Sequence, residues 1–263
     1  MSNWLDPVRR ALDEASAPVT FFFRDDDAGW SDERLFLLLD LFGDYGMPLD
    51  LAVIPLALTL ALARRIGDRV EARPDLVGVH QHGFAHINHE AEGRKCEFGP
   101  TRAAALQERD IRQGKQLLAE LLGPIVQPIF TPPWNRCGAL TGDCLTRLGF
   151  RVLSRESSAE PLGLPGLFEL PVHVDWFAKR KGVPLTREQV GMLIAERIGD
   201  SNPVGVMFHH ALMDEGEGQA AGELLSLLSS HNRVRCRLMQ ALAADQGDGG
   251  FRFQSHSGGC RQS

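Results

Sequence analysis

The chain has 263 residues, with 28 Lys and Arg against 34 Asp and Glu, so its formal charge is −6 at pH 7. Hydrophobic residues make up 43% and charged residues 24%, which excludes collagen-like, coiled-coil and wholly disordered chains. A mildly acidic chain is a poor electrostatic match for nucleic acid or an anionic membrane. We therefore expect no nucleic-acid partner.

The lack of a recognisable targeting segment and the cysteine usage predict a cytoplasmic protein. The longest charge-free apolar run, residues 51–63, is interrupted by Pro55 and is too short to span a bilayer. Charge appears within the first ten residues, and no apolar signal core follows. The five cysteines are odd in number and form no C-x-x-C pair, which argues against a disulfide framework or a cysteine-based zinc site.

Strand-like apolar segments alternate with helix-like segments along the chain. The expected strands are residues 19–24, 49–54, 76–80, 128–131, 150–154, 167–174 and 203–208. One helix is expected to begin at residue 31, and another to follow the second strand and end at about residue 71. Further helices are expected over 101–122 and 186–198, and residues 224–243 are expected to be mostly helical. This alternation predicts a mainly parallel sheet, and about seven units favour a single (β/α) barrel domain over residues 1–244.

The end of the chain, residues 245–263, is rich in Gly and Ser, which is typical of a flexible tail. Within this segment, Phe251 and Phe253 could add a short edge strand.

Histidines cluster in one ten-residue window of the sequence, HQHGFAHINH, which holds four of the nine. His82 and His86 are spaced i, i+4, which on a helical turn would put both imidazoles on one face. That pair suits a divalent metal that prefers nitrogen ligands, with a third ligand from elsewhere. The alternative is a polar loop. The roles of His80 and His89 stay open.

Three adjacent carboxylates, Asp25, Asp26 and Asp27, follow the first expected strand directly. They repel one another unless a positive charge lies among them, and a metal would supply it. The alternative is a solvated turn, since Asp is common in turns. The end of an apolar strand favours a functional site, because α/β barrels build their sites there.

Other strand ends carry further candidate site residues. His209 and His210 follow the last expected strand, and Asp175 ends another. Trp30, Trp134 and Trp176 follow strand ends too, where flat aromatic faces could contact a sugar ring. Tryptophans are also common in protein cores, so this signal is weak by itself.

Taken in chain order, these motifs resemble those of the polysaccharide deacetylase (NodB-homology) superfamily, over about residues 19–212. RDDDAG resembles its Asp-Asp motif, HGFAH its His-x-x-x-His motif, TPPWN its Arg-x-Pro-aromatic motif, HVDW its Asp-Trp motif and MFH its Leu-x-His motif. The resemblance implies a distorted (β/α) barrel of seven strands. It also implies a divalent metal, usually zinc, although two His and one carboxylate suit iron, cobalt or nickel as well.

The resemblance also implies roles for individual residues. Asp27, His82 and His86 would hold the metal, Asp26 would be the general base, and His209 the general acid. His210 is the reserve acid and a candidate substrate contact, and the register Asp25-Asp26 is the fallback. Asp175 would orient the acid or a ligand. The candidate substrate-binding residues are Trp30, Trp134, Asn135 and His210.

The sequence departs from the family pattern at two positions. Thr131 stands where the family has the arginine that orients the base, and Arg24 or Arg136 could replace it. Val172 stands where an acid would precede Asp175. The chain is more similar to cytoplasmic branches associated with surface-polysaccharide assembly, where the substrate could be a nucleotide-linked or lipid-linked sugar.

The expected activity is removal of an acetyl group from the amide nitrogen of an amino sugar. Two alternatives stay open: hydrolysis of another small amide, imide or ureide on the same fold, and a sugar- or partner-binding module that has lost catalysis. The sequence does not address the oligomeric state.

Overall fold

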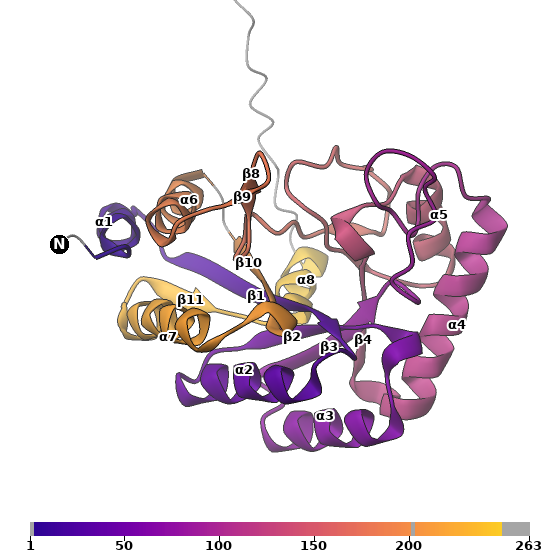
Figure 1. Cartoon of the computed structure of the whole chain (residues 1–263), viewed down its shortest axis with the longest axis horizontal. Helices are drawn as coiled ribbons and strands as arrows, with labels where there is room; N and C mark the ends of the chain where they lie inside the picture. Colours follow the sequence, from indigo (N-terminus) through magenta and orange to yellow (C-terminus); the bar gives the residue numbers. More distant parts are fainter. Residues whose placement is uncertain (1–2, 201–202, 249–263) are drawn as a thin grey trace, which may run out of the picture.

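A curved sheet of parallel strands forms the centre of the molecule (Figure 1). The computed structural model describes residues 3–200 and 203–248. The strands follow the order β6-β5-β4-β3-β2-β1-β10-β7, and β11 pairs with β1. Their bounds are β1 (Val19–Ala28), β2 (Leu49–Val53), β3 (Val77–His82), β4 (Val126–Thr131), β5 (Val152–Leu153), β6 (Phe168–Glu169), β7 (Val174–Asp175), β10 (Val204–His209) and β11 (Val234–Cys236).

One segment, residues 168–175, carries the sheet from β5 round to β10. Its start pairs with β5, Val172 bridges Glu156, and its end pairs with β10. The expected strand 167–174 is therefore divided into β6 and β7, which pair with different neighbours. The sheet curls into a distorted (β/α) barrel, and the predicted fold class is confirmed.

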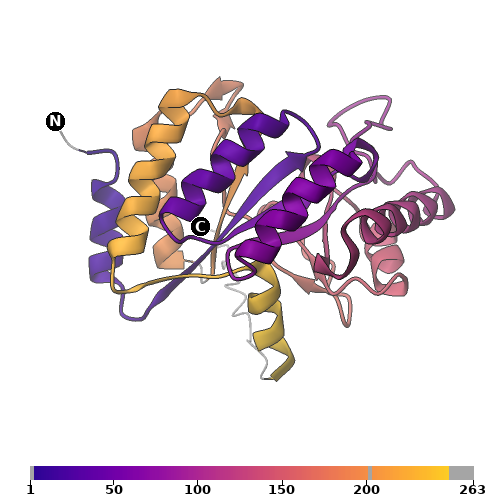
Figure 2. The same ribbon diagram turned by 90° about the horizontal axis from the view of Figure 1, so that it is seen from below.

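Helices cover the outside of the sheet, and Figure 2 shows α7, α2 and α3 side by side on one face. Their bounds are α1 (Asp6–Glu14), α2 (Asp32–Asp44), α3 (Leu60–Ala72), α4 (Ala104–Leu122), α5 (Ala139–Arg147), α6 (Arg187–Asp200), α7 (Glu215–Ser230) and α8 (Met239–Asp248). A small hairpin pairs β8 (Lys179–Arg180) with β9 (Val183–Pro184). The sequence analysis did not predict α1, α5 or this hairpin.

Alternation along β1 decides which side chains enter the barrel. Phe21 and Phe23 belong to the outer core beneath the helices, and the ring of Phe23 lies 5.2 Å from that of Phe42. Phe22 belongs to the inner cluster, with Met207. Successive side chains of a strand point to opposite faces, so Arg24 and Asp26 follow Phe22 inward while Asp25 faces the helices.

Apolar side chains fill the end of the barrel where the strands begin. Met239 and Leu242 of α8 join the inner cluster there. The carboxylate of Asp50, near the start of β2, accepts the N–H of Met239 at 2.9 Å. Burial raises the pKa of Asp50 to about 7. The opposite end, where the strands finish, is left for polar side chains.

The prediction that residues 224–243 are mostly helical is confirmed, with an interruption between residues 231 and 238. The chain forms α7, then β11 beside the start of β1, and then α8. The start of β1, residues 19–21, offers backbone partners to residues 234–236, so these residues form a strand between the two helices.

The predicted tail is described only at its beginning. Helix α8 includes residues 245–248, whereas Phe251 and Phe253 lie outside the described residues. Over residues 3–200 and 203–248, no helix is long and apolar enough to cross a membrane.

Candidate active site

The ends of β1, β3 and β10 bring the predicted polar residues together. β1 pairs with β10 in parallel, which sets Asp26 opposite His209. His82 is the last residue of β3, and His86 lies in the loop that follows. Parallel strands all finish at the same end of a barrel, so residues distant in sequence meet there.

Asp27, His82 and His86 form the candidate metal centre. Oδ1 of Asp27 lies 3.2 Å from Nε2 of His82 and 3.1 Å from Nε2 of His86. One ligand atom from each residue lies within 4.8 Å of the others, and no other group of this kind occurs in the described part of the chain. Burial acts to raise the pKa of Asp27, but the two imidazoles in their protonated form outweigh it and lower this pKa.

The hydrogen bonds of His82 leave its metal-facing nitrogen free. The carbonyl of Thr131 lies 3.1 Å from Nδ1 and can only accept, so Nδ1 carries the proton and Nε2 presents a lone pair. Both Nε2 of His82 and Oδ1 of Asp27 are buried without a hydrogen-bond partner within the described residues. Two facing acceptors need a proton or a cation between them, and this donor set fits a divalent metal such as zinc.

The predicted helical pairing of His82 and His86 is wrong. Strand β3 ends at His82, and the chain turns at Gly83, which has φ of 54°. His86 itself has φ of 57°, in the left-handed region. The two imidazoles meet because this loop folds back toward Asp27, and the i, i+4 spacing does not act through a helix.

Arg24 holds Asp26 from inside the barrel. Its Nε and Nη2 donate to the two carboxylate oxygens of Asp26 at 2.7 and 2.9 Å. Other hydrogens of the guanidinium reach Ser154 Oγ at 2.7 Å and Asn135 Oδ1 at 2.5 Å. Burial acts to raise the pKa of Asp26, but the charge and hydrogen bonds of Arg24, together with the charges of His82 and His209, outweigh it, so the pKa falls below its usual value.

Asp25 faces away from the candidate metal centre and pairs with His210. The Asp25 carboxylate accepts the backbone N–H of His210 at 2.9 Å and its Nδ1–H at 2.6 Å. Nε2 of His210 donates to the carbonyl of Trp30 at 2.5 Å. Burial acts to lower the pKa of His210, but Asp25 and Trp30 favour the imidazolium and raise it to about 9.

His209 lies at the rim of the centre and Asp175 lies near it. His209 is half-buried, and its Nδ1 has no hydrogen-bond partner among the described residues. The carboxylate of Asp175 accepts the N–H of Phe177 at 2.9 Å. Burial raises the pKa of Asp175, although the charge of His209 opposes this shift. Asp175 therefore influences His209 by charge and not through a described hydrogen bond.

Two indole rings flank His86. The ring centroids of Trp30 and Trp134 lie 4.8 and 4.4 Å from that of His86. The side chain of Trp30 is 40% exposed, so this wall is open to solvent. Trp176 instead is buried against Phe208 and donates to a carboxylate of Glu217 at 2.6 Å, which places it in the core and not at a cleft mouth.

The remaining histidines of the cluster differ from the two candidate ligands. His80 is buried, and its Nε2 lies 2.9 Å from the hydroxyl of Thr131. Burial lowers the pKa of His80 to about 3, so this imidazole is neutral at pH 7. His89 is exposed.

The comparison with solved structures relates this arrangement to a known fold. A proposed polysaccharide deacetylase from Mycobacterium smegmatis gives a TM-score of 0.68 at 16% identity, over 88% of this chain and 91% of that one. A family 4 acetyl xylan esterase from Clostridium thermocellum, in complex with cobalt, gives 0.59 at 12% identity over 87% and 92%. The chain has the polysaccharide deacetylase fold.

The deacetylase fold by itself does not decide activity. A family 4 pseudoenzyme from Bacillus anthracis also matches, with a TM-score of 0.56 at 12% identity over 87% of this chain and 66% of that one. Neither a family model nor a curated protein matches the sequence. Function must therefore be argued from the side chains of this chain.

Of the two arginines expected as replacements at the position of Thr131, only Arg24 bonds the Asp26 carboxylate among the described residues. Arg136, the other candidate, donates to the carbonyl of Lys95 at 3.1 Å and has no described bond to Asp26. The guanidinium thus comes from the same strand as the carboxylate that it holds, two residues away and on the same face.

An Arg24→Lys variant is expected to lose about 2 kcal/mol of unfolding free energy, because an ammonium cannot bond both Asp26 oxygens and reach Ser154 and Asn135 as well. Urea unfolding measures the loss. Arg136→Lys is the matched control and should change stability by less than about 0.5 kcal/mol. Equal losses of unfolding free energy in the two variants would show that the hydrogen bonds of Arg24 contribute no more to stability than those of Arg136.

Glu97 is a further residue of the site that was not predicted from the sequence. Its carboxylate accepts backbone N–H groups of Phe84 and Ala85, which lie between His82 and His86. The surrounding sequence indicates only weakly that Glu97 is buried. It stands between Cys96 and Phe98, both of which are buried, at the end of a charged loop.

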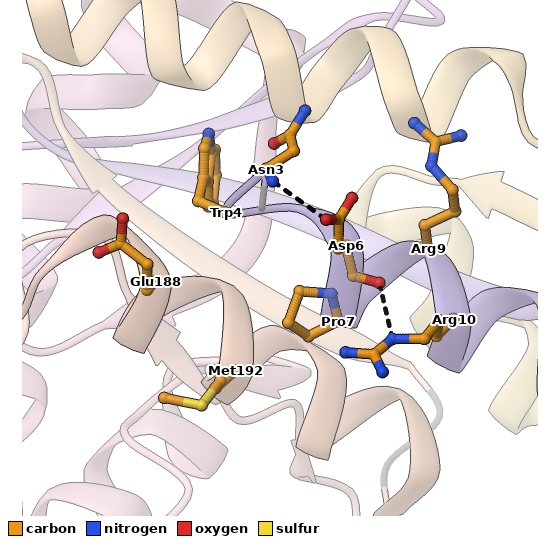
Figure 3. Close-up of a pocket in the computed structure, with 8 residues that line it drawn as sticks. All are labelled: Asn3, Trp4, Asp6, Pro7, Arg9, Arg10, Glu188 and Met192. Atoms are coloured by element: carbon orange, nitrogen blue, oxygen red, sulfur yellow. Dashed lines mark hydrogen bonds between the residues drawn. The ribbon is translucent and has the colours of Figure 1, made fainter. Parts of the chain in front are cut away.

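A separate hollow of about 520 Å³ lies between α1 and α6 (Figure 3). Trp4 and Arg10 line it from the α1 side, and Glu188 and Met192 from α6. The carboxylate of Asp6 accepts the N–H of Asn3 at 3.0 Å at its rim. None of the candidate metal ligands lines this hollow, so it is distinct from the site at the strand ends.

Proposed function

We propose that the chain is a metal-dependent hydrolase that removes an acetyl group from the amide nitrogen of an amino sugar. The observation that carries the proposal is the pair of facing, unpartnered acceptors on Asp27 and His82, with His86 beside them and Asp26 on the adjacent residue. The polysaccharide deacetylase fold supports this reading.

The candidate ligands are Asp27, His82 and His86, and zinc is the first choice of ion. A divalent cation bound there would polarise the amide carbonyl and make a water molecule more acidic. Asp26 is a carboxylate at neutral pH and accepts the proton of the attacking water. Arg24 holds both oxygens of Asp26, so the carboxylate of this base is fixed in one orientation.

His209 is the proposed proton donor to the leaving nitrogen. It lies beside Asp26 across the β1–β10 pairing, and Nδ1 is free of described partners. As water attacks, a C–O bond forms, Asp26 takes one proton, and the C–N bond breaks while His209 protonates the amine. The products are acetate and a free amino sugar.

The proposed substrate wall is formed by Trp30 and Trp134. Their rings border His86 and are at least partly exposed, so a sugar ring could pack against them. Asn135 and His210 have their polar atoms engaged with Arg24, Asp25 and Trp30. We assign these two residues to supporting the wall and the base, not to direct substrate contact.

A lapsed sugar-binding module is the second candidate, because one structural match is described as a pseudoenzyme. The presence of Asp26, Asp27 and His209 in one place favours catalysis, since binding alone needs no acid–base pair.

Acetate release from N-acetylglucosamine oligomers, with zinc or cobalt added, tests the proposal. The wild type should release acetate, and Asp26→Asn should lower kcat by about 10²–10⁴-fold while still binding metal. Calorimetric metal titration checks that second point. An inactive wild type with full metal would favour the binding module, and an active Asp26→Asn variant would remove Asp26 from the mechanism.

A further inference from the structure

Glu97 is a fully buried carboxylate without a cationic partner. Its exposed fraction is 0%, and no ion pair reaches it within the described residues. Arg102 donates to its backbone carbonyl, not to its side chain. A buried charge is costly unless hydrogen bonds compensate it, so the bonds that it makes identify its role.

Both oxygens of Glu97 bind the loop between the two candidate histidine ligands. Oε2 accepts the N–H of Phe84 at 3.1 Å, and Oε1 accepts the N–H of Ala85 at 2.8 Å. Strand pairing cannot serve these two donors, because β3 ends at His82. The carboxylate therefore supplies the two hydrogen-bond acceptors that a neighbouring strand would otherwise supply.

Gly83 shows how closely the loop wraps this carboxylate. A Cβ at Gly83 would lie 2.3 Å from Oε2 of Glu97, and the residue has φ of +54°. The N–H of Gly83 donates to the carbonyl of Thr131 at 2.9 Å, and the N–H of Leu56 donates to the carbonyl of Phe84 at 3.1 Å. The loop is thus held at several successive peptide groups.

His86 needs this restraint because its backbone is strained. A non-glycine residue in the left-handed region costs of order 1–3 kcal/mol and persists only where its surroundings impose it. The bonds from Glu97 end one residue before His86, whose Nε2 lies 3.1 Å from Asp27.

We propose that Glu97 is a positioning residue that sets His86 as a metal ligand through the backbone of residues 84 and 85. The inference rests on the proposed metal-binding function and deepens it. Glu97 does not touch the metal or the substrate. Its effect on the ligand set resembles that of the hydrogen-bond partners that orient metal ligands elsewhere, whose loss lowers metal affinity about 10–100-fold.

Calorimetric titration with cobalt chloride, together with the visible absorption of bound cobalt, tests this proposal. Glu97→Gln keeps the size of the side chain but turns an NH₂ group toward a backbone donor. It should weaken cobalt binding about 10–100-fold and alter the absorption of bound cobalt. Glu90→Gln is the matched control in the same segment, because its carboxylate accepts only the hydroxyl of Thr101 among the described residues. It should bind cobalt like the wild type.

A second variant, Glu97→Asp, separates position from charge and is available should Glu97→Gln fail to fold. It keeps the negative charge but is one methylene shorter, so it cannot reach both N–H groups. Positioning predicts weakened cobalt binding in Glu97→Asp, with a far-ultraviolet circular dichroism spectrum like that of the wild type.

The outcomes separate this inference from the proposed function. Wild-type affinity in both Glu97 variants would overturn the role of Glu97 while leaving the metal site intact. Wild-type affinity in Glu97→Asp alone would assign the effect to charge and overturn positioning. Failure of the wild type itself to bind cobalt would overturn both the metal site and the inference.

Discussion

An Asp27→Ala variant is expected to lose tight binding of divalent metal, and with it at least about a thousandfold in the rate of acetate release. Removing Asp27 leaves two imidazoles, too few for a catalytic site with three protein ligands. Stabilisation by the metal is worth several kcal/mol in the transition state, and each 1.36 kcal/mol is tenfold in rate. His82→Ala should have the same effect, because its Nε2 is the buried lone pair that faces Asp27.

Elemental mass spectrometry of the purified proteins measures the metal, and acetate release measures the rate. His89→Ala is the matched control: it belongs to the same histidine-rich segment, but its side chain is exposed. It should keep about one equivalent of metal. The assignment of the metal centre is wrong if Asp27→Ala or His82→Ala retains metal like the wild type.

Replacing His210 by Gln is expected to remove a pH-dependent part of the protein's stability. In the folded protein the pKa of His210 is about 9, against 6.5 for an unperturbed histidine. The folded state therefore binds the proton more tightly than the unfolded state. This stabilisation is complete below pH 6.5 and is lost as the pH rises to about 9. Its size is about 3 kcal/mol, at 1.36 kcal/mol for each pKa unit.

Urea unfolding at several pH values between 6 and 9.5 measures this loss as the difference between wild type and His210→Gln. The difference should shrink by about 3 kcal/mol across that range. His231→Gln is the control, since His231 meets a largely exposed Asp13 at 3.2 Å and such surface pairs contribute little. A difference that stays constant with pH would mean that His210 is not an imidazolium in the folded protein.

The strands that carry the site could be predicted from the sequence because each is short, apolar and followed directly by polar residues. The runs ending in Asp27, His82 and His209 have this form, and each of them ends a strand of the barrel or lies near its end. Parallel strands deliver these ends to one place regardless of the loops between them. Strand ends thus indicated where a polar site would lie, and the motif resemblance supplied the expected roles of its residues.

Local spacing misled where the backbone is irregular. His82 and His86 suggested a helical turn, but Gly83 and His86 adopt positive φ. The bonds that impose this shape come from Glu97 and Thr131, far enough along the chain that no short pattern contains them. The mostly helical stretch expected over 224–243 also holds a short strand that local pattern did not reveal, since pairing with β1 decides the structure of residues 234–236.

The roles within the aspartate run were ambiguous in the sequence and distinct in the structure. The sequence alone does not distinguish the three neighbouring aspartates. Strand alternation sends Asp26 inward to Arg24 and Asp25 outward to His210, and a register shift after Asp25 turns Asp27 toward the histidines. This arrangement favours Asp26-Asp27 over Asp25-Asp26 as the base–ligand pair.

By itself the sequence determined the fold class and which kinds of side chain follow the strands, because hydrophobic periodicity and the succession of strand-like and helix-like segments are local properties of the chain. Only the tertiary structure decided which carboxylate faces which partner, that Arg24 bonds both oxygens of Asp26, and that Glu97 holds the histidine loop. Those outcomes depend on register, on a bulge and on hydrogen bonds between distant segments, and these form only once the barrel has closed.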